Sequence, residues 1–268
     1  MRHKVTLTLV LIAAAYLVLC LLLFWLQGYL LFPGLGRKHE PLELPAGVRV
    51  QELSLADGTR YRTAVFDVEK PRGVLAYFVG NGEDLSSGVR WAANFGAYGL
   101  QTIVTEYPGY GESQGSPSFE SIMACAERSG AEAEIWSKNK SVPLFVAGHS
   151  MGTFSAMHLA AAGTGDRLLL IAPPTSIAAA GSARYPFLPV ALLLRHPFDN
   201  LGKAASIRLP TLVIHGDSDT IVPIEMGKEL VAAIPGARMV VAPGQGHNSL
   251  QLHLGGRLGI EIAGHFFQ

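Results

Sequence analysis

The sequence predicts an α/β fold: a mostly parallel, eight-stranded sheet flanked by helices and preceded by an N-terminal transmembrane helix. Three observations predict it. The chain opens with a long uncharged run, short apolar segments alternate with helix-compatible stretches of about 15–25 residues, and a strand runs through a glycine-flanked turn into a helix near Ser150. With 268 residues, 49% of them hydrophobic, the chain is large enough to bury one sizeable core.

Composition excludes several classes of function. Charged residues make up 16% of the chain, 21 basic against 21 acidic, so there is no basic surplus for binding nucleic acid. The two cysteines, Cys20 and Cys125, are too few for a disulfide framework or a four-ligand zinc site. No grouping of His, Asp and Glu has metal-ligand spacing, so the sequence implies no metal and no other cofactor.

The first element is the apolar run over residues 5–26, which carries no charge across 22 residues. At about 1.5 Å rise per residue, a helix of this length crosses a hydrocarbon core of roughly 30 Å. Arg2 and Lys4 precede the run, whereas the next cations, Arg37 and Lys38, come about ten residues after it. This bias predicts a single-pass membrane protein with a cytoplasmic N-terminus and the remaining chain on the outer, periplasmic or extracytoplasmic side.

A cleaved secretory signal is the alternative for this segment. Such signals have an apolar region of about 7–15 residues that ends in small residues at the cleavage site. The present run is longer, and Trp25 and Tyr29 lie near its end, where aromatic rings favour the membrane interface. We therefore expect a retained anchor over residues 1–27, a linker over 28–45 and a folded domain over 46–268.

The domain opens with two antiparallel strands. Alternating residues over 48–55 and 60–68 flank Asp57-Gly58, a strong hairpin signal. The later strands are expected to be buried on both faces and mostly parallel, at residues 74–79, 100–105, 144–147, 168–171, 211–215 and 239–242. Residues 173–206 interrupt this pattern, and we interpret them as an apolar insertion.

The strand at 144–147 leads directly into Gly148-His149-Ser150-Met151-Gly152 and then into a helix-forming segment at 153–162. Small residues at both ends let the backbone turn tightly, so the Ser150 hydroxyl is exposed above the strand and the helix N-terminus points amides toward it. The pattern favours Ser150 as a nucleophile. The alternative is a glycine-rich turn in which Ser150 only caps the helix.

A serine hydroxyl is a poor nucleophile at neutral pH, so this interpretation requires a histidine base and a carboxylate that orients it. Two carboxylates, Asp217 and Asp219, follow the strand at 211–215. His247 follows the next strand in a glycine-containing loop, which can direct it back over the strand ends. The chain order Ser, Asp, His is complete.

These segments resemble those of the α/β-hydrolase superfamily. The chain is most similar to membrane-anchored, single-domain serine hydrolases, often named after dienelactone hydrolase or prolyl oligopeptidase, which include acyl-protein thioesterase-like members. The resemblance covers about residues 45–268. It implies Ser150 as nucleophile, Asp219 as the acid in His-Gly-x-x-Asp-x-x-Val-Pro, and His247 as base. Asp217 can then be explained as a turn former.

The resemblance also implies an oxyanion hole. One donor is the Met151 N–H, and the other is the Asn81 N–H in the loop after the strand at 74–79. The family has His-Gly-Asn in this loop, whereas this chain has Val79 in place of the histidine. A backbone donor does not depend on the neighbouring side chain. Alternatively, Asn81 and Asp84 form a turn and cap the next helix.

Four residues are candidates for the substrate pocket. Tyr110 lies in a loop resembling the family's Asp-Tyr-Arg-Gly-Tyr-Gly segment, in which Pro108 here replaces the arginine. It either shapes the floor of the site or contacts substrate. Tyr185, Phe187 and Leu188 lie in the apolar insertion, which we interpret as a lid or acyl-pocket wall, with core packing as the alternative.

Together these features predict a membrane-anchored serine hydrolase that cleaves carboxylic ester or thioester bonds of small-molecule, acyl or lipid-like substrates through an acyl-enzyme intermediate. A serine peptidase is one alternative, although the chain has no evident accessory domain to hold a peptide. A non-catalytic binding module on a hydrolase scaffold is another, but it requires a lost triad position, and none is lost.

Overall fold

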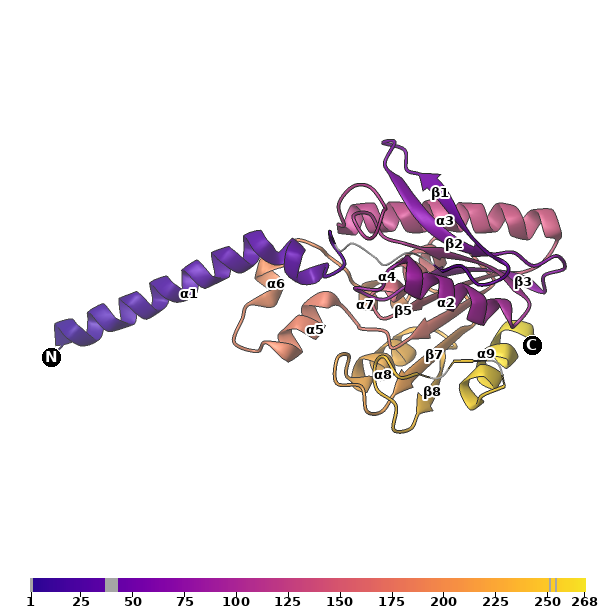
Figure 1. The fold of residues 1–268 in the computed structure, drawn as a ribbon. Coiled ribbons are helices and arrows are strands. Elements are labelled where there is room, and N and C mark those ends of the chain that lie inside the picture. Colours follow the sequence, from indigo (N-terminus) through magenta and orange to yellow (C-terminus); the bar gives the residue numbers. More distant parts are fainter. Residues whose placement is uncertain (1, 37–42, 251, 254) are drawn as a thin grey trace.

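The computed structural model consists of an eight-stranded sheet between two layers of helices, with one long helix, α1 (Arg2–Leu31), projecting away from the domain (Figure 1). The structure describes residues 2–36, 43–250, 252–253 and 255–268. Residues 37–42 of the expected linker therefore lie outside the described part of the chain.

The sheet is mixed and mostly parallel, as the sequence predicts. Its strand order is β1-β2-β4-β3-β5-β6-β7-β8. The pairs β1–β2 and β2–β4 are antiparallel, and the other pairs are parallel. The strands are β1 (Val48–Ser54), β2 (Arg60–Phe66), β3 (Gly73–Phe78), β4 (Leu100–Thr105), β5 (Leu144–His149), β6 (Arg167–Ile171), β7 (Thr211–Gly216) and β8 (Arg238–Ala242).

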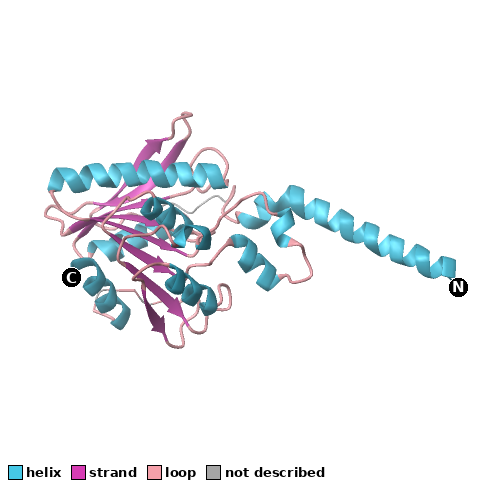
Figure 2. Cartoon of the chain, turned by 180° about the vertical axis from the view of Figure 1, so that it is seen from behind, coloured by secondary structure: helices cyan, strands magenta, loops and turns pink. Residues whose placement is uncertain are grey.

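Helices cover both faces of this sheet (Figure 2). The helices next to the sheet are α2 (Leu85–Gly96), α3 (Phe119–Lys140), α4 (Gly152–Ala161), α7 (Leu201–Ala204), α8 (Ile224–Ala233) and α9 (Arg257–Phe267). The short helices α5 (Ile177–Arg184) and α6 (Val190–Leu193) lie away from the sheet, beside α1 (Figure 1). Side chains alternate between faces along each strand. Leu75 and Tyr77 belong to the core on the side of α2 and α9, whereas Val74, Ala76 and Phe78 belong to the core on the side of α3, α4 and α8. The strands β3, β4, β5 and β7 are therefore buried along their whole length, whereas the edge strands β1 and β8 are partly exposed.

The β1–β2 hairpin turns at the Asp57-Gly58 pair. Gly58 has φ +85°, a left-handed conformation that glycine adopts without a steric penalty. The Asp57 carboxylate accepts a hydrogen bond from the Thr59 N–H at 2.8 Å, which closes the turn. The two strands then pair through all seven residues of β1, from Val48 opposite Phe66 to Ser54 opposite Arg60.

Helix α1 is exposed over most of its length. Within the described residues it is the one helix long and apolar enough to cross a membrane, with a mean hydropathy of 2.9. Length and composition permit either a membrane anchor or a signal sequence. The helix continues to Leu31, beyond residue 27 where the expected anchor ends. Its last turns contact the domain, and those contacts reach the candidate site described below.

The core gives a direct test of this packing. Phe145 of β5 is 1% exposed and stacks on Phe266 of α9, with ring centroids 4.6 Å apart. We expect Phe145→Ala to lower the free energy of unfolding by about 3–5 kcal/mol, because apolar burial is lost and a cavity remains. Urea denaturation in detergent measures the change. Ile135→Ala on α3, where the side chain is 52% exposed, is the control and should change stability by less than about 0.5 kcal/mol. Equal losses would contradict the packing described.

Candidate active site

The turn between β5 and α4 holds Ser150 in an unusual backbone conformation. Its φ is +51°, in the left-handed region that non-glycine residues rarely adopt. The Ser150 N–H donates to the Ile171 carbonyl at 2.8 Å. The Ser150 carbonyl accepts from the Thr153 N–H at 3.1 Å and from the Thr153 hydroxyl at 2.6 Å. These bonds stabilise a turn that aims the hydroxyl away from the sheet.

Two glycines make this turn possible. A Cβ on Gly148 would lie 2.3 Å from the Gly152 carbonyl oxygen, and a Cβ on Gly152 would lie 2.0 Å from the Phe78 carbonyl oxygen. Both contacts are with backbone atoms, which have little freedom to shift. A side chain at either position would therefore force the strand and helix apart and displace Ser150.

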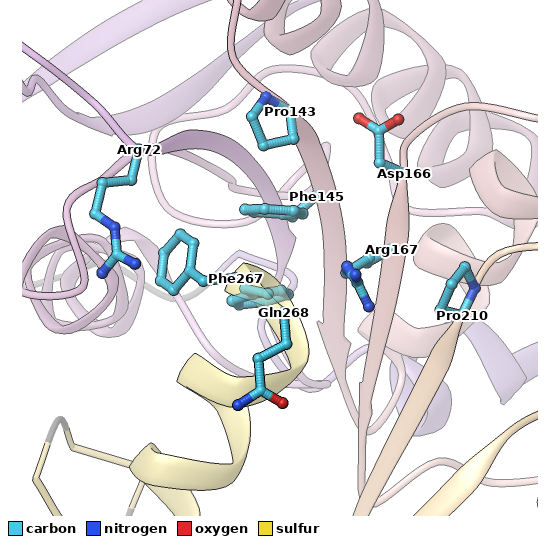
Figure 3. A pocket seen from close by; sticks show the side chains of 9 residues that line it. Arg72, Pro143, Phe145, Asp166, Arg167, Pro210, Phe267 and Gln268 are labelled. Carbon is cyan, nitrogen blue, oxygen red and sulfur yellow. The ribbon is translucent and has the colours of Figure 1, made fainter.

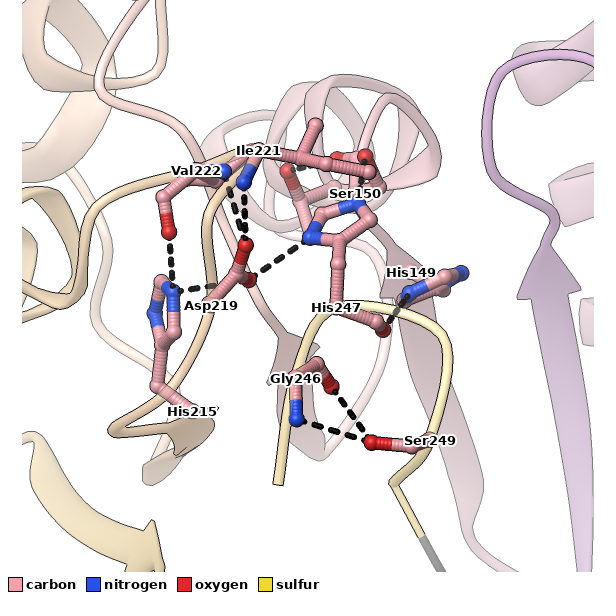
Figure 4. Close-up of polar contacts among 10 residues, drawn as sticks. His149, Ser150, His215, Asp219, Ile221, Val222, Gly246, His247 and Ser249 are labelled. Atoms are coloured by element: carbon pink, nitrogen blue, oxygen red, sulfur yellow. Dashed lines mark hydrogen bonds and ion pairs between the residues drawn. The ribbon is translucent and has the colours of Figure 1, made fainter. Parts of the chain in front are cut away.

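Ser150, His247 and Asp219 meet beyond the carboxyl ends of β5, β8 and β7 (Figure 4). His247 Nε2 lies 2.8 Å from Ser150 Oγ, and His247 Nδ1 lies 2.7 Å from Asp219 Oδ2. The imidazole thus lies between the serine hydroxyl and the aspartate carboxylate. The Asp219 side chain is fully buried, and His247 is 8% exposed.

Asp219 is held as a carboxylate by the groups around it. Its Oδ1 accepts the N–H groups of Ile221 and Val222 at 2.9 and 2.8 Å. His215 Nε2 lies 2.9 Å from the Val222 carbonyl and 3.3 Å from Asp219 Oδ2. Burial raises the pKa of Asp219, but the hydrogen bonds from His215, His247 and Val222 outweigh that effect and hold the pKa well below its usual range.

Asp217 has a different role. Its Oδ1 accepts the Gly244 N–H at 2.7 Å and the Ser218 hydroxyl at 3.1 Å. It thus joins the loop after β7 to the loop after β8, which carries His247. Of the two carboxylates that the sequence left as candidates, the structure places Asp219 beside the imidazole of His247.

The two backbone groups expected to form an oxyanion hole are both open. Neither the Asn81 N–H nor the Met151 N–H has an acceptor in the described part of the chain. The adjacent Gly80 N–H, in contrast, donates to the carboxylate of Glu83. The Glu83 bond therefore fixes the loop while leaving the next N–H available.

The Asn81 side chain connects this loop to the end of α1. Its amide Nδ2 donates to the Leu31 carbonyl at 2.6 Å, and its Oδ1 accepts the Tyr110 hydroxyl at 2.9 Å. Tyr110 is fully buried and forms an isolated β-bridge with Leu35. Tyr110 thus supports the Asn81 loop, which favours the structural interpretation of this residue over substrate contact.

A pocket of about 300 Å³ opens beside His247. It is lined by Asn81, Gly82, Glu83, Trp91, His149, Ile171, His247, Asn248 and Leu250. Glu83 Oε1 accepts the Trp91 indole N–H at 3.3 Å, and His149 Nδ1 lies 3.6 Å from Glu83 Oε2. Burial raises the pKa of Glu83, but the nearby His149 ring and the N–H groups of Gly80 and Trp91 together bring the pKa below its usual value.

Sequence reasoning missed Glu83 and Trp91. A signal for Glu83 exists, because it stands three residues after Gly80 in the oxyanion loop and can reach back to that N–H. Trp91 lies on α2 and carried no such signal. The other pocket candidates, Tyr185, Phe187 and Leu188, do not line this pocket. They lie between α5 and α6, with Tyr185 48% and Phe187 65% exposed, and their contact with substrate stays a prediction.

A second hollow lies at the opposite edge of the sheet, where the parallel strands begin (Figure 3). It has a volume of about 510 Å³ and includes Arg72, whose guanidinium carbon lies 3.6 Å from the centre of the Phe267 ring. Ligands of open α/β sheets bind at the carboxyl ends of the strands. This hollow is therefore not the candidate site. Across the described residues, no group of three or more His, Cys, Asp or Glu could hold a metal ion.

Two family models match overlapping parts of the chain. The model described as serine aminopeptidase, S33, matches residues 69–201, and the model described as alpha/beta hydrolase fold matches residues 171–254. The two matches together contain Ser150, Asp219 and His247. The chain belongs to the α/β-hydrolase superfamily.

Curated relatives of this α/β hydrolase include an uncharacterized protein of Mycobacterium tuberculosis. It is 36% identical over 192 residues, which cover 70% of this chain and 66% of that protein. The lysophosphatidylserine lipase ABHD12 of Danio rerio is 30% identical over 154 residues, covering 49% of this chain and 39% of the lipase. The chain thus matches less than two thirds of the length of either relative.

Solved structures share the fold. An esterase of Pyrococcus furiosus superposes with a TM-score of 0.62 at 16% identity, covering 87% of this chain and 97% of the esterase. A predicted CIB-like hydrolase of Thermoplasma acidophilum gives a TM-score of 0.52 at 22% identity, covering 75% of this chain and 90% of that one. At these identities the likeness concerns the α/β-hydrolase fold alone.

The environment of Asp219 predicts a pH dependence of stability. The ordinary pKa of this side chain is 3.8, and the folded protein lowers it. The ionised carboxylate therefore stabilises the fold above about pH 4, and that contribution is lost as pH falls from 3.8 through the folded pKa. We expect the stability difference between wild type and Asp219→Asn to be largest near pH 7 and to shrink toward about pH 3. Denaturant titrations measure it, and a pH-independent difference would contradict this electrostatic picture.

Proposed function

We propose that this α/β hydrolase cleaves carboxylic ester or thioester bonds through an acyl-enzyme intermediate. The observation that carries the proposal is the placement of His247 between the other two groups, with one ring nitrogen 2.8 Å from the Ser150 hydroxyl and the other 2.7 Å from the Asp219 carboxylate. A general base must lie within hydrogen-bond reach of the proton that it removes, and this one does.

The proposed steps use this arrangement of the three side chains. Ser150 Oγ attacks the acyl carbon while its proton moves to His247 Nε2, and Asp219 stabilises the resulting imidazolium through Nδ1. The negative oxygen is stabilised by the Asn81 and Met151 N–H groups. When the carbonyl re-forms, the bond to the alcohol or thiol breaks and that group takes the proton from His247. Water then repeats the sequence and releases the carboxylic acid.

The pocket and the relatives support acyl substrates. Trp91, Ile171 and Leu250 provide apolar walls beside His247, while Glu83 and His149 provide polar groups. A curated relative is named as a lysophosphatidylserine lipase, and a protein of the same fold is an esterase. The match to the serine aminopeptidase model keeps an aminoacyl bond as the second candidate.

We also place α1 in the membrane as a retained anchor, with its N-terminus in the cytoplasm and the catalytic domain outside. The support is the charge bias, since Arg2 and Lys4 precede the apolar run. The side chains of Thr6 and Thr8 donate to the carbonyls of Arg2 and Lys4, at 3.1 and 3.0 Å. These hydroxyls therefore need no water, as a helix in lipid requires.

The nucleophile can be tested by covalent labelling. Wild-type protein in detergent should react with a fluorophosphonate probe, and Ser150→Ala should lose the label because it lacks the attacking oxygen. In-gel fluorescence after a fixed time measures the product. The control is Ser249→Ala, which changes a nearby hydroxyl that bonds the Gly246 N–H. A wild type that stays unlabelled, or an equally labelled Ser150→Ala, would remove the proposed function.

The two aspartates of the β7 loop form a matched pair for the acid. Asp219→Asn should lower kcat by a factor on the order of 10⁴, because the amide no longer orients the histidine and stabilises its charge. Asp217→Asn should change kcat by no more than several-fold, since its carboxylate bonds loop backbone. Hydrolysis of p-nitrophenyl acetate and of an aminoacyl anilide measures kcat for both bond types. Loss of activity in the Asp217 variant alone would reverse the assignment, and cleavage of the anilide alone would favour the peptidase.

A further inference from the structure

The insertion after β6 forms a helical hairpin, residues 176–199, that exposes apolar side chains. We call it the α5–α6 hairpin. Phe187 at its turn is 65% exposed, and Leu192 on α6 is 83% exposed. No Asp or Glu occurs between Arg167 and Phe198. A soluble surface of this length normally carries charges of both signs, so this hairpin is not built to face water.

The hairpin lies along α1, and polar side chains of α1 hold it there (Figures 1 and 2). The Tyr16 hydroxyl donates to the Phe187 carbonyl at 2.7 Å. Gln27 Nε2 donates to the Leu193 carbonyl at 3.0 Å, and Gln27 Oε1 accepts the Arg195 N–H at 2.8 Å. Tyr16 and Gln27 are 11 residues apart, which is about 16 Å along a helix. The contact therefore follows α1 well beyond its last turn.

Almost all backbone N–H groups in the turn of the hairpin have acceptors within the protein. In residues 185–190, the N–H groups of Tyr185, Leu188 and Val190 donate to backbone carbonyls within the hairpin. Pro186 and Pro189 have no N–H. This leaves Phe187 as the residue of this turn whose N–H has no acceptor in the described structure. Irregular backbone is tolerated in an apolar medium only when its polar groups are satisfied in this way.

The base of the hairpin stands next to the nucleophile. The Asn200 side chain donates to the Thr153 hydroxyl at 3.0 Å and to the Pro174 carbonyl at 2.9 Å. Thr153 in turn donates to the Ser150 carbonyl. On the other side of the site, the Leu31 carbonyl of α1 holds the Asn81 side chain. The two elements with apolar surfaces thus both reach the catalytic centre.

From these contacts we propose that the α5–α6 hairpin inserts beside α1 into the outer leaflet of the bilayer, so that the site opens at the membrane surface and takes its acyl substrates from that leaflet. The occupant of the apolar face is lipid hydrocarbon, and the substrate class is a membrane-resident ester or thioester with a long acyl chain. The substrate assignment rests on the proposed function, whereas the insertion of the hairpin does not.

Arg184 is the cation nearest the turn of the hairpin, and it limits how deep this turn can lie. Arg184 ends α5, and its guanidinium carbon lies 5.8 Å from the centre of the Tyr185 ring. A guanidinium avoids the bilayer centre, but its long stem can carry it toward the headgroups. With residues 5–26 as the span, Tyr16 lies ten residues, or about 15 Å, from the outer end. The hairpin therefore reaches no deeper than one leaflet.

Site-directed labelling tests the insertion independently of catalysis. The full chain carrying Cys20→Ser and Leu192→Cys, labelled with an NBD fluorophore, is reconstituted into phosphatidylcholine vesicles containing acyl-chain nitroxide lipids. We expect blue-shifted emission and at least twofold quenching. The matched control is a label on Ile135→Cys, which is 52% exposed on α3, and this label should be quenched weakly. Quenching at residue 192 no stronger than at residue 135 would overturn the proposal.

Activity tests the substrate class. Leu192→Asp should reduce kcat/KM for monooleoyl lysophosphatidylcholine in vesicles at least tenfold, and leave hydrolysis of the soluble p-nitrophenyl acetate unchanged. Ile135→Asp should change neither, and the unchanged soluble reaction shows that the variant is folded. An equal rate on the vesicle substrate for wild type and Leu192→Asp would overturn the leaflet-substrate assignment. If the wild type cleaves neither ester, both the proposed function and the substrate class are wrong. The insertion of the hairpin is tested separately, by the nitroxide quenching.

Discussion

The close approach of backbone at the turn after β5 is the constraint on which the rest of the site depends. Gly148 and Gly152 leave no room for a Cβ, and only because both lack one can Ser150 adopt φ +51° above the strand end. That conformation places the hydroxyl within hydrogen-bond distance of His247, which lies in the loop after β8. It also begins α4 immediately behind the serine, so the Met151 N–H stays open. One local steric condition thereby positions the hydroxyl and one backbone donor together.

Much of this arrangement could be predicted from the sequence, because its signals are local. The eight strands follow from short apolar runs, and their order along the chain is enough to place the ends of β5, β7 and β8 at one edge of a parallel sheet. The meeting of Ser150, Asp219 and His247 then follows from loop positions. The choice between Asp217 and Asp219 depended on resemblance, and the contacts of each carboxylate with its neighbours now distinguish them physically.

The remaining features depend on contacts between residues far apart in the chain, for which no local pattern exists. Tyr16 meets Phe187 across 171 positions, and Asn81 meets Leu31 across 50. A tyrosine and a glutamine in an apolar helix are compatible with many partners, so their presence alone does not predict a docked hairpin. Apolar side chains such as Phe187 likewise suit a pocket wall, a core or a lipid-facing surface equally well from sequence. Only the fold distinguishes these environments, by showing which of them the polypeptide leaves uncovered.

The hydrogen bond that the Gly244 N–H donates to Asp217 affects how the catalytic residues move relative to one another. Together with the bonds from the Asp217 and Ser218 N–H groups to the carbonyls of Ala242 and Gln245, it extends the β7–β8 pairing into the loops beyond the sheet. Asp219 and His247 therefore lie in two loops that are hydrogen-bonded to each other, whereas Ser150 lies in the separate turn between β5 and α4. We expect thermal motion to change the distance between Ser150 Oγ and His247 Nε2 more than the distance between Asp219 Oδ2 and His247 Nδ1. The imidazole would then keep its orientation while its distance from the serine hydroxyl varies.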